Sequence, residues 1–379
     1  MRVLVAPDKF KGSLTAAEAA TAIADGLAKA GFETVTLPLA DGGDGSVEAT
    51  LSAGYHRHPV RVRGADGGMH DTSFATDGDT AVVEVANTCG LSTLPPGTRA
   101  PLSSSSYGFG QAVLAARDAG ARRIVLALGG SASTDGGTGM LSALGVVFLD
   151  SAGRRLDPDG GTLGRIARVE LGALADLDPV DLVVAGDVTN PLLGPHGAAA
   201  VFGPQKGADD HQLDTLEAGL RHLIEVLPPG AAGGAAGLAA APGAGAAGGL
   251  GLACRWLGGR SVAGAEFFLD LLHFDQVVAD CDVVVTGEGG MDSQTLNGKL
   301  PAVVAHRSAP RPVYAVVGRS QVTEHEQARL GLRGIHALAS MTTADPSTDP
   351  ALSRALAASA SQRIGLELHA ASHSTAGAR

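Results

Sequence analysis

The chain has 379 residues, of which 45% are hydrophobic, and a formal net charge of −11 at pH 7. This length favours two hydrophobic cores, while the negative charge and an aromatic content of 3% argue against a nucleic-acid surface. The sequence shows no apolar run of bilayer length and no signal peptide over residues 1–13, and Cys89, Cys254 and Cys281 lack metal or disulfide spacing. These features predict a cytoplasmic enzyme without nucleic-acid or membrane partners.

Short runs of Val, Ile and Leu recur along the chain, and most are closely followed by Gly or Asp. Their apolar residues do not alternate with polar ones, which is typical of strands buried on both faces. After the first run, a capping box from Thr15 to Glu18 and a stop at Gly31 predict a helix, so the order is strand, helix, strand. The predicted strands cover residues 3–6, 34–39, 124–128, 182–185, 283–286, 313–317 and 335–339.

Residues 56–84 alternate apolar and polar side chains around turn clusters, which is typical of antiparallel strands. We therefore predict an α/β protein with a doubly wound, Rossmann-like parallel-sheet domain that is interrupted by a larger mixed α/β domain. The first domain is predicted to comprise residues 1–45 and 275–379, and the second residues 46–274. Residues 228–251 are nearly all Gly, Ala and Pro, a composition that by itself predicts a flexible linker. We also expect disorder over residues 370–379.

Polar motifs follow several predicted strands, at the ends where parallel sheets bind ligands. The first of them, APDKFKGSL, places Lys9, Lys11 and Ser13 before a helix N-terminus, which favours an anion. A single motif of this kind is readily explained as a tight turn with solvated carboxylates, but six that combine Lys, Asp and Gly are not. The six are APDKFKGSL (6–14), DGGDG (41–45), GGSASTDGGTG (129–139), GDVTNPLL (186–193), GPQKG (203–207) and TGEGGMDSQTLNGK (286–299).

Lysine is rare in this chain, with five residues against 23 arginines, and every lysine except Lys29 lies in one of these motifs. A lysine is a compact point charge that can follow a moving phosphate, whereas arginine is a rigid planar fork. Glycines let backbone amides close on phosphate oxygens, and carboxylates hold Mg²⁺ or accept a proton from an attacking hydroxyl. The combination predicts a phosphotransferase, although the sequence has neither a P-loop nor the protein-kinase motifs.

The ordered motifs resemble those of the bacterial type-1 glycerate kinases. The resemblance extends from Arg2 to about Met341 and also includes PLADGGDG, DVTNPLLGPHGA with VFGPQKGA, GAGAAGGLG and TGEGGMDSQTLNGKLP. It implies an enzyme that uses ATP and Mg²⁺ to phosphorylate D-glycerate, generally at the 2-hydroxyl, in a cleft between two domains. A monomer and a homodimer are both compatible with the sequence.

For the individual roles, we predict Asp187, Lys9 and Asn190 as catalytic residues. Asp187 follows a predicted buried strand and precedes a rigid Asn-Pro turn, so it is the candidate proton acceptor, although a carboxylate that caps this turn is an equally good interpretation. Lys9 is the candidate phosphate contact. The predicted metal ligands are Asp292 and Asp41, with Glu288 as an alternative to Asp292. The predicted nucleotide contacts are Lys11, Ser13, Gly287, Glu288, Gly289, Lys299, Lys206, Gly136 and Gly137.

Three other classes of protein share part of this sequence pattern. A kinase for another small hydroxy acid would carry the same motifs. A two-domain solute-binding protein fits the α/β pattern, but carboxylates beside lysines and the lack of a signal peptide argue against it. An oxidoreductase would need a dinucleotide fingerprint, and the G-x-G-x-x-G at residues 243–248 follows a Pro/Ala/Gly run instead of a predicted strand.

Overall fold

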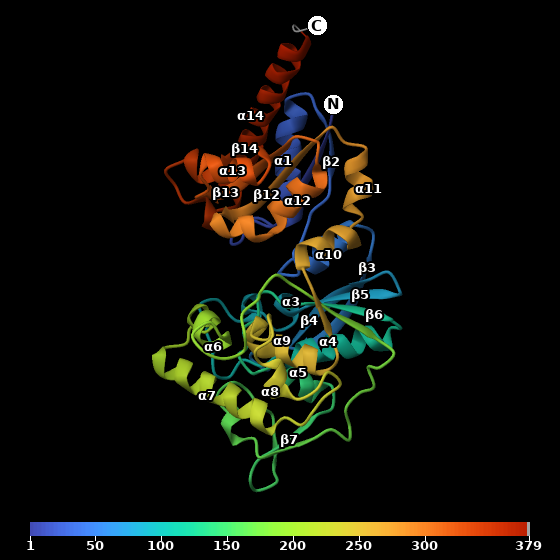
Figure 1. The fold of residues 1–379 in the computed structure, drawn as a ribbon, viewed down its shortest axis with the longest axis vertical. Coiled ribbons are helices and arrows are strands. Elements are labelled where there is room, and N and C mark those ends of the chain that lie inside the picture. The colour runs from blue at the N-terminus through green and yellow to red at the C-terminus, as the bar shows by residue number, and fades with distance from the viewer. Residues whose placement is uncertain (377–379) are drawn as a thin grey trace. The chain divides into compact units, whose positions relative to one another are not determined.

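The computed structural model describes residues 1–376, and the chain divides into two compact units. Unit 1 comprises Met1–Asp41, Glu48–Ala53 and Gly264–Arg379, and unit 2 comprises Gly42–Val47 and Gly54–Ala263. The chain thus leaves unit 1 after Asp41, contributes six residues to unit 2 and returns to unit 1 at Glu48. Figure 1 shows the elements of both units in the colours of the chain.

Unit 1 is built on a parallel sheet with strand order β14-β13-β12-β1-β2. In β1, Val3 and Val5 belong to one core cluster with residues of the first and last helices, whereas Leu4 between them is buried outside that cluster. Successive side chains of a strand point to opposite faces, so both faces of the sheet are covered, as predicted for a doubly wound fold. The strands are β1 (Arg2–Pro7), β2 (Glu33–Thr36), β12 (Val283–Met291), β13 (Val313–Ser320) and β14 (Leu332–Ala337).

The first helix begins and ends as predicted. The Thr15 hydroxyl accepts a hydrogen bond from the Glu18 N–H at 3.2 Å, and Gly31 adopts a φ of 86° just beyond the helix end. The last helix continues through residues 370–376, so the predicted disorder is wrong there, and residues 377–379 lie outside the described chain. The helices are α1 (Ala16–Lys29), α2 (Ser46–Ser52, shared with unit 2), α10 (Gly264–Leu271), α11 (Phe274–Ala279), α12 (Leu300–Ser308), α13 (Glu324–Arg329) and α14 (Pro350–Ala376).

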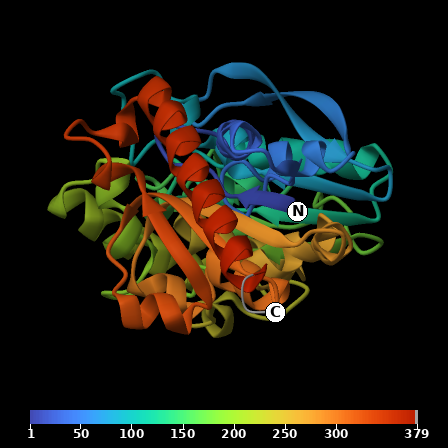
Figure 2. The ribbon, with the colours of Figure 1, turned by 90° about the horizontal axis from the view of Figure 1, so that it is seen from above.

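Helices α1 and α14 lie side by side, and Figure 2 shows α14 in red across the orange strands of the sheet. Their backbones approach closely at Gly26, where an added Cβ would lie 2.1 Å from both the Ala358 carbonyl oxygen and the Ser361 hydroxyl. A second close approach occurs at Gly365, where a Cβ would lie 2.4 Å from that of Ala30. Glycine is therefore needed inside these helices despite its low helix propensity.

Unit 2 contains a six-stranded sheet with order β11-β10-β6-β5-β4-β3. Strands β5, β6, β10 and β11 are parallel to one another. Within residues 56–84, β3 and β4 form a hairpin and β4 also runs antiparallel to β5, in agreement with the antiparallel pattern predicted there. A small antiparallel sheet has the order β8-β7-β9. The strands are β3 (His56–Arg63), β4 (Met69–Thr76), β5 (Thr80–Glu84), β6 (Arg123–Ala127), β7 (Val147–Leu149), β8 (Arg155–Leu156), β9 (Arg168–Glu170), β10 (Asp181–Ala185) and β11 (Arg260–Val262).

The Gly/Ala/Pro segment of unit 2 is not a flexible linker, which corrects the prediction for residues 228–251. It includes α8 and the first half of α9, and Ala244 and Leu250 are completely buried. Gly230 packs against the indole of Trp256, where an added Cβ would lie 2.5 Å from the ring. The helices of unit 2 are α3 (Val85–Cys89), α4 (Tyr107–Asp118), α5 (Thr138–Ala143), α6 (Ala198–Phe202), α7 (Asp210–Val226), α8 (Ala235–Leu238) and α9 (Ala246–Trp256).

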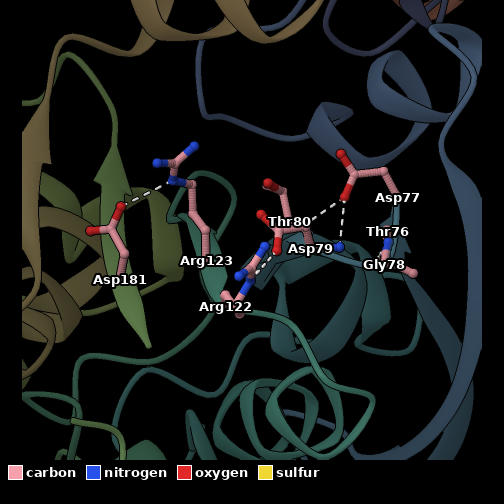
Figure 3. A network of polar contacts seen from close by, with 8 residues as sticks. All are labelled: Thr76, Asp77, Gly78, Asp79, Thr80, Arg122, Arg123 and Asp181. Carbon is pink, nitrogen blue, oxygen red and sulfur yellow. Dashed lines mark hydrogen bonds and ion pairs between the residues drawn. The ribbon is translucent and has the colours of Figure 1, made fainter. Parts of the chain in front are cut away.

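Charged side chains join the amino ends of the unit 2 strands (Figure 3). Asp181 at the start of β10 pairs with Arg123 of β6 at 3.0 Å, and the neighbouring Arg122 pairs with Asp79 ahead of β5. The Asp77 carboxylate accepts hydrogen bonds from the backbone N–H groups of Asp79 and Thr80, which closes the turn before β5. The amino ends are thus tied by ion pairs, while the polar motifs lie at the carboxyl ends.

We predict that Gly26→Ala lowers the free energy of unfolding of unit 1 by about 1–3 kcal/mol, because the new methyl group must force α1 and α14 apart. The matched control is Gly237→Ala in α8, where a Cβ meets no atom within 4 Å. That substitution should be neutral or slightly stabilising, since alanine favours the helix. Thermal unfolding followed by circular dichroism measures both variants, and equal midpoints would contradict the proposed close packing.

Candidate active site

The carboxyl ends of β1 and β12 in unit 1 bring two acidic residues together. Pro7 pairs with Gly287 in the parallel register, so the residues that follow, Asp8 and Glu288, lie at the same edge of the sheet. The Asp8 N–H donates to the Gly287 carbonyl at 2.8 Å, which fixes this end of β1. The Asp8 carboxylate accepts the Lys9 backbone N–H at 2.7 Å and lies 3.7 Å from the Lys9 ammonium. The predicted phosphate contact Lys9 is therefore part of this cluster.

The other carboxylates predicted for the nucleotide and metal sites lie at the same edge. Asp41 follows the extension of β2, in which the Leu39 N–H donates to the Pro7 carbonyl at 2.9 Å. Asp292 follows β12 directly, and its carboxylate lies 3.6 Å from the Lys299 ammonium. Unit 1 thus gathers acidic and basic groups at the carboxyl ends of neighbouring strands.

Burial and mutual repulsion raise the pKa values of two carboxyl groups in this cluster. Desolvation raises the pKa of Asp8 to about 7; Lys9 opposes the rise, while Asp41 and Glu288 add to it. Desolvation also raises the pKa of Glu288 to about 7, against the opposing charge of Lys299. The Thr295 hydroxyl donates to Glu288 Oε1 at 3.1 Å. Carboxyl groups held in this way are typical of functional sites.

The N-terminus of α1 is less suited to an anion than the sequence suggested. The Glu18 carboxylate accepts the Thr15 N–H at 2.9 Å and is paired with Arg354 at 2.8 Å, and these contacts lower the pKa of Glu18. A protein carboxylate therefore already lies at this helix end. In the loop before it, the Ser13 hydroxyl donates to the Phe10 carbonyl at 3.3 Å, and Lys11 is exposed.

The glycines of β12 allow close contacts within unit 1. A Cβ on Gly287 would lie 2.3 Å from the Val316 carbonyl oxygen of β13, and one on Gly289 would lie 2.9 Å from the backbone nitrogen of Lys11. These glycines bring the loop of Lys11 against β12. Their predicted contact with a nucleotide stays a prediction.

In unit 2, the DGGDG segment lies across the carboxyl ends of two strands. A Cβ on Gly42 would lie 2.2 Å from the Ala185 carbonyl at the end of β10. A Cβ on Gly129, just after β6, would lie 2.5 Å from the Cα of Gly43, and the Gly129 N–H reaches the Gly42 carbonyl at 3.4 Å. Backbone contacts this close leave no room for a Cβ, so glycine is needed at positions 42 and 129.

Asp187 lies two residues beyond β10, at this same edge, and is exposed. The loop that follows is closed by Asn190, whose side-chain amide donates to the His196 carbonyl at 2.9 Å and whose own carbonyl accepts the Gly245 N–H at 3.0 Å. The structure therefore gives Asn190 a role in shaping the loop. It brings Asp187 close to the DGGDG segment, because Gly42 contacts the Ala185 carbonyl.

Lys206 is buried, with 2% of its surface exposed, and its ammonium contacts the loop after β6. It donates to the Ser133 carbonyl, and the Thr134 and Ser131 hydroxyls lie 3.4 Å and 3.5 Å away. Three protein oxygens match the three donors of an ammonium group. The side chain is thus used within the protein, and a nucleotide contact by Lys206 stays a prediction.

The same loop contains Asp135, which the sequence analysis did not assign to the site. It is fully buried and accepts hydrogen bonds from the Ser106 hydroxyl at 2.7 Å and from the N–H groups of Ser106, Gly137 and Gly139 at 2.8–3.2 Å. Gly136 and Gly137 have left-handed φ values of 64° and 78°, and Cβ atoms there would lie 2.4 Å from Leu223 of α7 and Ala253 of α9. The packing of the loop explains these two glycines.

Within residues 1–376, no group of three or more His, Cys, Asp or Glu side chains is arranged to hold a metal ion. No helix in that part of the chain is long and apolar enough to cross a membrane. Mg²⁺ in phosphoryl-transfer sites is usually held by one or two carboxylates together with phosphate oxygens and water. The carboxylates at the unit 1 edge therefore fit such an ion without forming a complete cage.

Comparison with known proteins identifies the class. A sequence profile of the glycerate kinase family matches residues 3–364. The glycerate kinase of Bacillus subtilis (strain 168) is 41% identical over 327 residues, which cover 84% of this chain and 85% of the relative. The glycerate 2-kinase of Escherichia coli (strain K12) is 38% identical over 328 residues, with 84% and 85% covered. The crystal structure of a glycerate kinase 2 from Salmonella typhimurium LT2 matches with a TM-score of 0.78 at 34% identity and covers 98% of this chain and 99% of that one.

The fold, the lysines and carboxylates at the sheet edges, and these relatives define the protein as a phosphotransferase. The chain belongs to the glycerate kinase family. The resemblance inferred from the sequence motifs is thereby confirmed.

The burial of Lys206 leads to a prediction about pH. Desolvation lowers the pKa of its ammonium group from 10.5 to about 8, against the opposing charge of Asp135. Between these two pH values the unfolded chain binds more protons than the folded one, so the free energy of unfolding rises with pH. We expect this rise, up to roughly 3 kcal/mol, to be absent in Lys206→Met.

Trp256 is the single tryptophan of the chain and is buried in unit 2, so its fluorescence during urea unfolding measures the stability of that unit. The comparison between pH 7 and pH 10 is made for both proteins, so that other titrating groups cancel. If the free energy of unfolding depended on pH in the same way in wild type and in Lys206→Met, the lowered pKa of Lys206 would be contradicted.

Proposed function

We propose that this enzyme transfers the γ-phosphoryl group of ATP to the 2-hydroxyl of D-glycerate and releases 2-phosphoglycerate and ADP. Family membership supports glycerate as the acceptor, and the name of the Escherichia coli relative, glycerate 2-kinase, supports the position of the hydroxyl. The observation that carries the proposal is that charged residues gather at the carboxyl ends of the strands in both sheets. One edge gathers Lys9, Lys299 and four acidic residues, and the other presents Asp187.

For the nucleotide we propose the edge of unit 1. Phosphoryl transfer requires positive charge near the phosphate oxygens and little covalent chemistry from the protein, so positioning and electrostatics provide the catalysis. Lys9 and Lys299 are the cations of this edge, and each lies within 4 Å of a carboxylate that orients it. Lys11 and Ser13 belong to the adjoining loop, and Lys11 is exposed to solvent.

Asp292 and Asp41 are the residues that we propose as ligands for Mg²⁺, with Glu288 as the alternative. A bound Mg²⁺ would neutralise charge on the phosphate oxygens. Four carboxylates, those of Asp8, Asp41, Glu288 and Asp292, outnumber the two lysines of this edge, and burial raises the pKa values of Asp8 and Glu288 to about 7, with repulsion from Asp41 adding to the rise. A divalent cation is the group that such an excess would accept.

For the acceptor we propose Asp187 as the general base. Its exposed carboxylate at the carboxyl end of β10 is accessible to a small substrate, and the Asn190 loop holds the chain that carries it. A base at this place takes the proton of the glycerate hydroxyl as the oxygen attacks the phosphorus. The alternative that Asp187 only caps its own turn predicts different variant behaviour.

The test of the proposed reaction is a coupled assay with purified protein. We expect ADP release only when ATP, Mg²⁺ and D-glycerate are all present, and phosphorus NMR of the product should show 2-phosphoglycerate. Removal of Mg²⁺ with a chelator should abolish turnover, and adding Mg²⁺ back should restore it. Formation of 3-phosphoglycerate would reject the position of transfer, whereas phosphorylation of another hydroxy acid alone would reject the substrate.

Asp187→Asn distinguishes a base from a cap. We expect kcat to fall by roughly 10²- to 10⁴-fold, because asparagine cannot take up the proton, while the KM for ATP and the thermal midpoint stay nearly unchanged. Asparagine caps turns as well as aspartate does, so a purely structural Asp187 would tolerate the change.

The matched control is Asp178→Asn, an exposed aspartate ahead of the amino end of β10. It should leave kcat unchanged. Near-normal turnover in Asp187→Asn would remove Asp187 from the catalytic residues.

A further inference from the structure

The side chain of Glu84, the last residue of β5, accepts hydrogen bonds from the backbone of the segment formed by residues 42–47. Its Oε1 accepts a hydrogen bond from the Gly45 N–H at 3.0 Å, and its Oε2 accepts one from the Val47 N–H at 2.9 Å. Only 3% of Glu84 is exposed. Hydrogen bonds to an ionised acceptor are stronger than neutral ones, and both carboxylate oxygens are used here on one short segment. The placement of residues 42–47 therefore depends on this side chain.

Residues 42–47 also contact the next two strands of the sheet, β6 and β10. Glu84 pairs with Ala127 of β6 in the parallel register, and Ala127 pairs with Ala185 of β10. Gly42 lies against the Ala185 carbonyl, and the Gly42 carbonyl accepts the Gly129 N–H after β6. The segment thus contacts the carboxyl ends of three adjacent strands. Ser46 closes it internally, because its hydroxyl donates to the Gly43 carbonyl at 2.6 Å.

This arrangement places Asp44 at the edge that also carries Asp187. Asp44 is exposed, and a Cβ on Gly130 would lie 3.7 Å from the Asp44 Cβ, so its side chain begins over the loop that follows β6. Asp187 follows the next strand, β10, whose last carbonyl is contacted by Gly42. Two exposed carboxylates on adjacent strand ends are suited to a small acceptor with two hydroxyl groups, since each carboxylate can accept one hydroxyl hydrogen.

We propose that Glu84 is a positioning residue for phosphoryl transfer, acting through the segment that presents Asp44 to the acceptor. Glu84 itself is buried and does not touch the substrate. Its carboxylate fixes the backbone that directly follows Asp44, at Gly45 and Val47. A displacement of about 1 Å in a group that orients a substrate can lower a rate roughly 10²-fold. The inference rests on the proposed function and adds Asp44 and Glu84 to the residues that serve the acceptor.

The test is a double-mutant cycle with Glu84→Gln and Asp44→Asn. Glutamine keeps the size of the side chain but presents an NH₂ group where one backbone N–H needs an acceptor. We expect Glu84→Gln to lower kcat/KM for glycerate by at least about tenfold, roughly 1.4 kcal/mol in transition-state stabilisation, with less than a twofold change in the KM for ATP. Because Glu84 acts through Asp44, the double variant should be no more impaired than Asp44→Asn alone.

Hydrogen exchange provides a second measurement that does not depend on activity. The amides of Gly45 and Val47 should lose protection in Glu84→Gln and keep it in Asp44→Asn. The matched control is Asp150→Asn, since Asp150 is also a buried carboxylate whose Oδ1 accepts two backbone N–H groups, those of Ala152 and Arg154, but it lies in the turn between β7 and β8. Its change should alter stability without altering kcat or either KM.

Three results would overturn the inference. Kinetics of Glu84→Gln equal to those of Asp150→Asn would make Glu84 a structural residue only. Additive effects in the double variant would show that Glu84 does not act through Asp44. Unchanged protection of Gly45 and Val47 would remove the proposed anchor. A wild-type enzyme that phosphorylates no glycerate would instead reject the proposed function, and the inference with it, so the two failures are distinguishable.

Discussion

The parallel register of the strands determines which residues meet at the carboxyl ends of the strands in each unit. In unit 1 it pairs Pro7 with Gly287, so Asp8 and Glu288 must emerge together at the end of β1 and β12. In unit 2 the ends of β5, β6 and β10 are in register in the same way. A shift of one residue would turn each of these side chains to the opposite face of its sheet. Residues far apart in the sequence are thereby brought together.

Glycine is what lets loops lie directly on these strand ends. Gly42 adopts a φ of 85° and approaches the Ala185 carbonyl so closely that no side chain fits between them. In unit 1, burial raises the pKa values of Asp8 and Glu288 to about 7. Folding alone gains nothing from buried carboxyl groups that repel one another. Their presence at a strand edge supports the proposal that this edge binds a charged ligand.

Much of the fold could be predicted from local sequence. The apolar runs identified the five strands of the unit 1 sheet and the strands β6 and β10 of unit 2, and the Thr15 capping box and Gly31 defined the first helix, because these signals act over a few residues. The Gly/Ala/Pro segment was misjudged as a linker, since composition does not show that small residues serve close packing. Gly230, for example, lies against the Trp256 ring.

The candidate sites were only partly predictable for a related reason. Lys9 and Asp187 lie in glycine-rich motifs directly after strands, and that pattern is visible in one sequence. Glu84 occupies the end of an ordinary apolar strand, and its partners Gly45 and Val47 precede it by almost forty residues. No local pattern reports a hydrogen bond to a distant backbone. The burial of Lys206 among the oxygens of the β6 loop is likewise a property of the folded chain.

We propose that the charged residues at the strand ends act through their chemistry and placement, and are not merely a source of charge. Lys9→Arg against Lys29→Arg measures this directly, since both keep the charge and only Lys9 lies at the strand edge, whereas Lys29 is exposed at the end of α1. We expect kcat/KM for ATP to fall by at least about tenfold in Lys9→Arg and to stay unchanged in Lys29→Arg. Equal values for the two variants would contradict it.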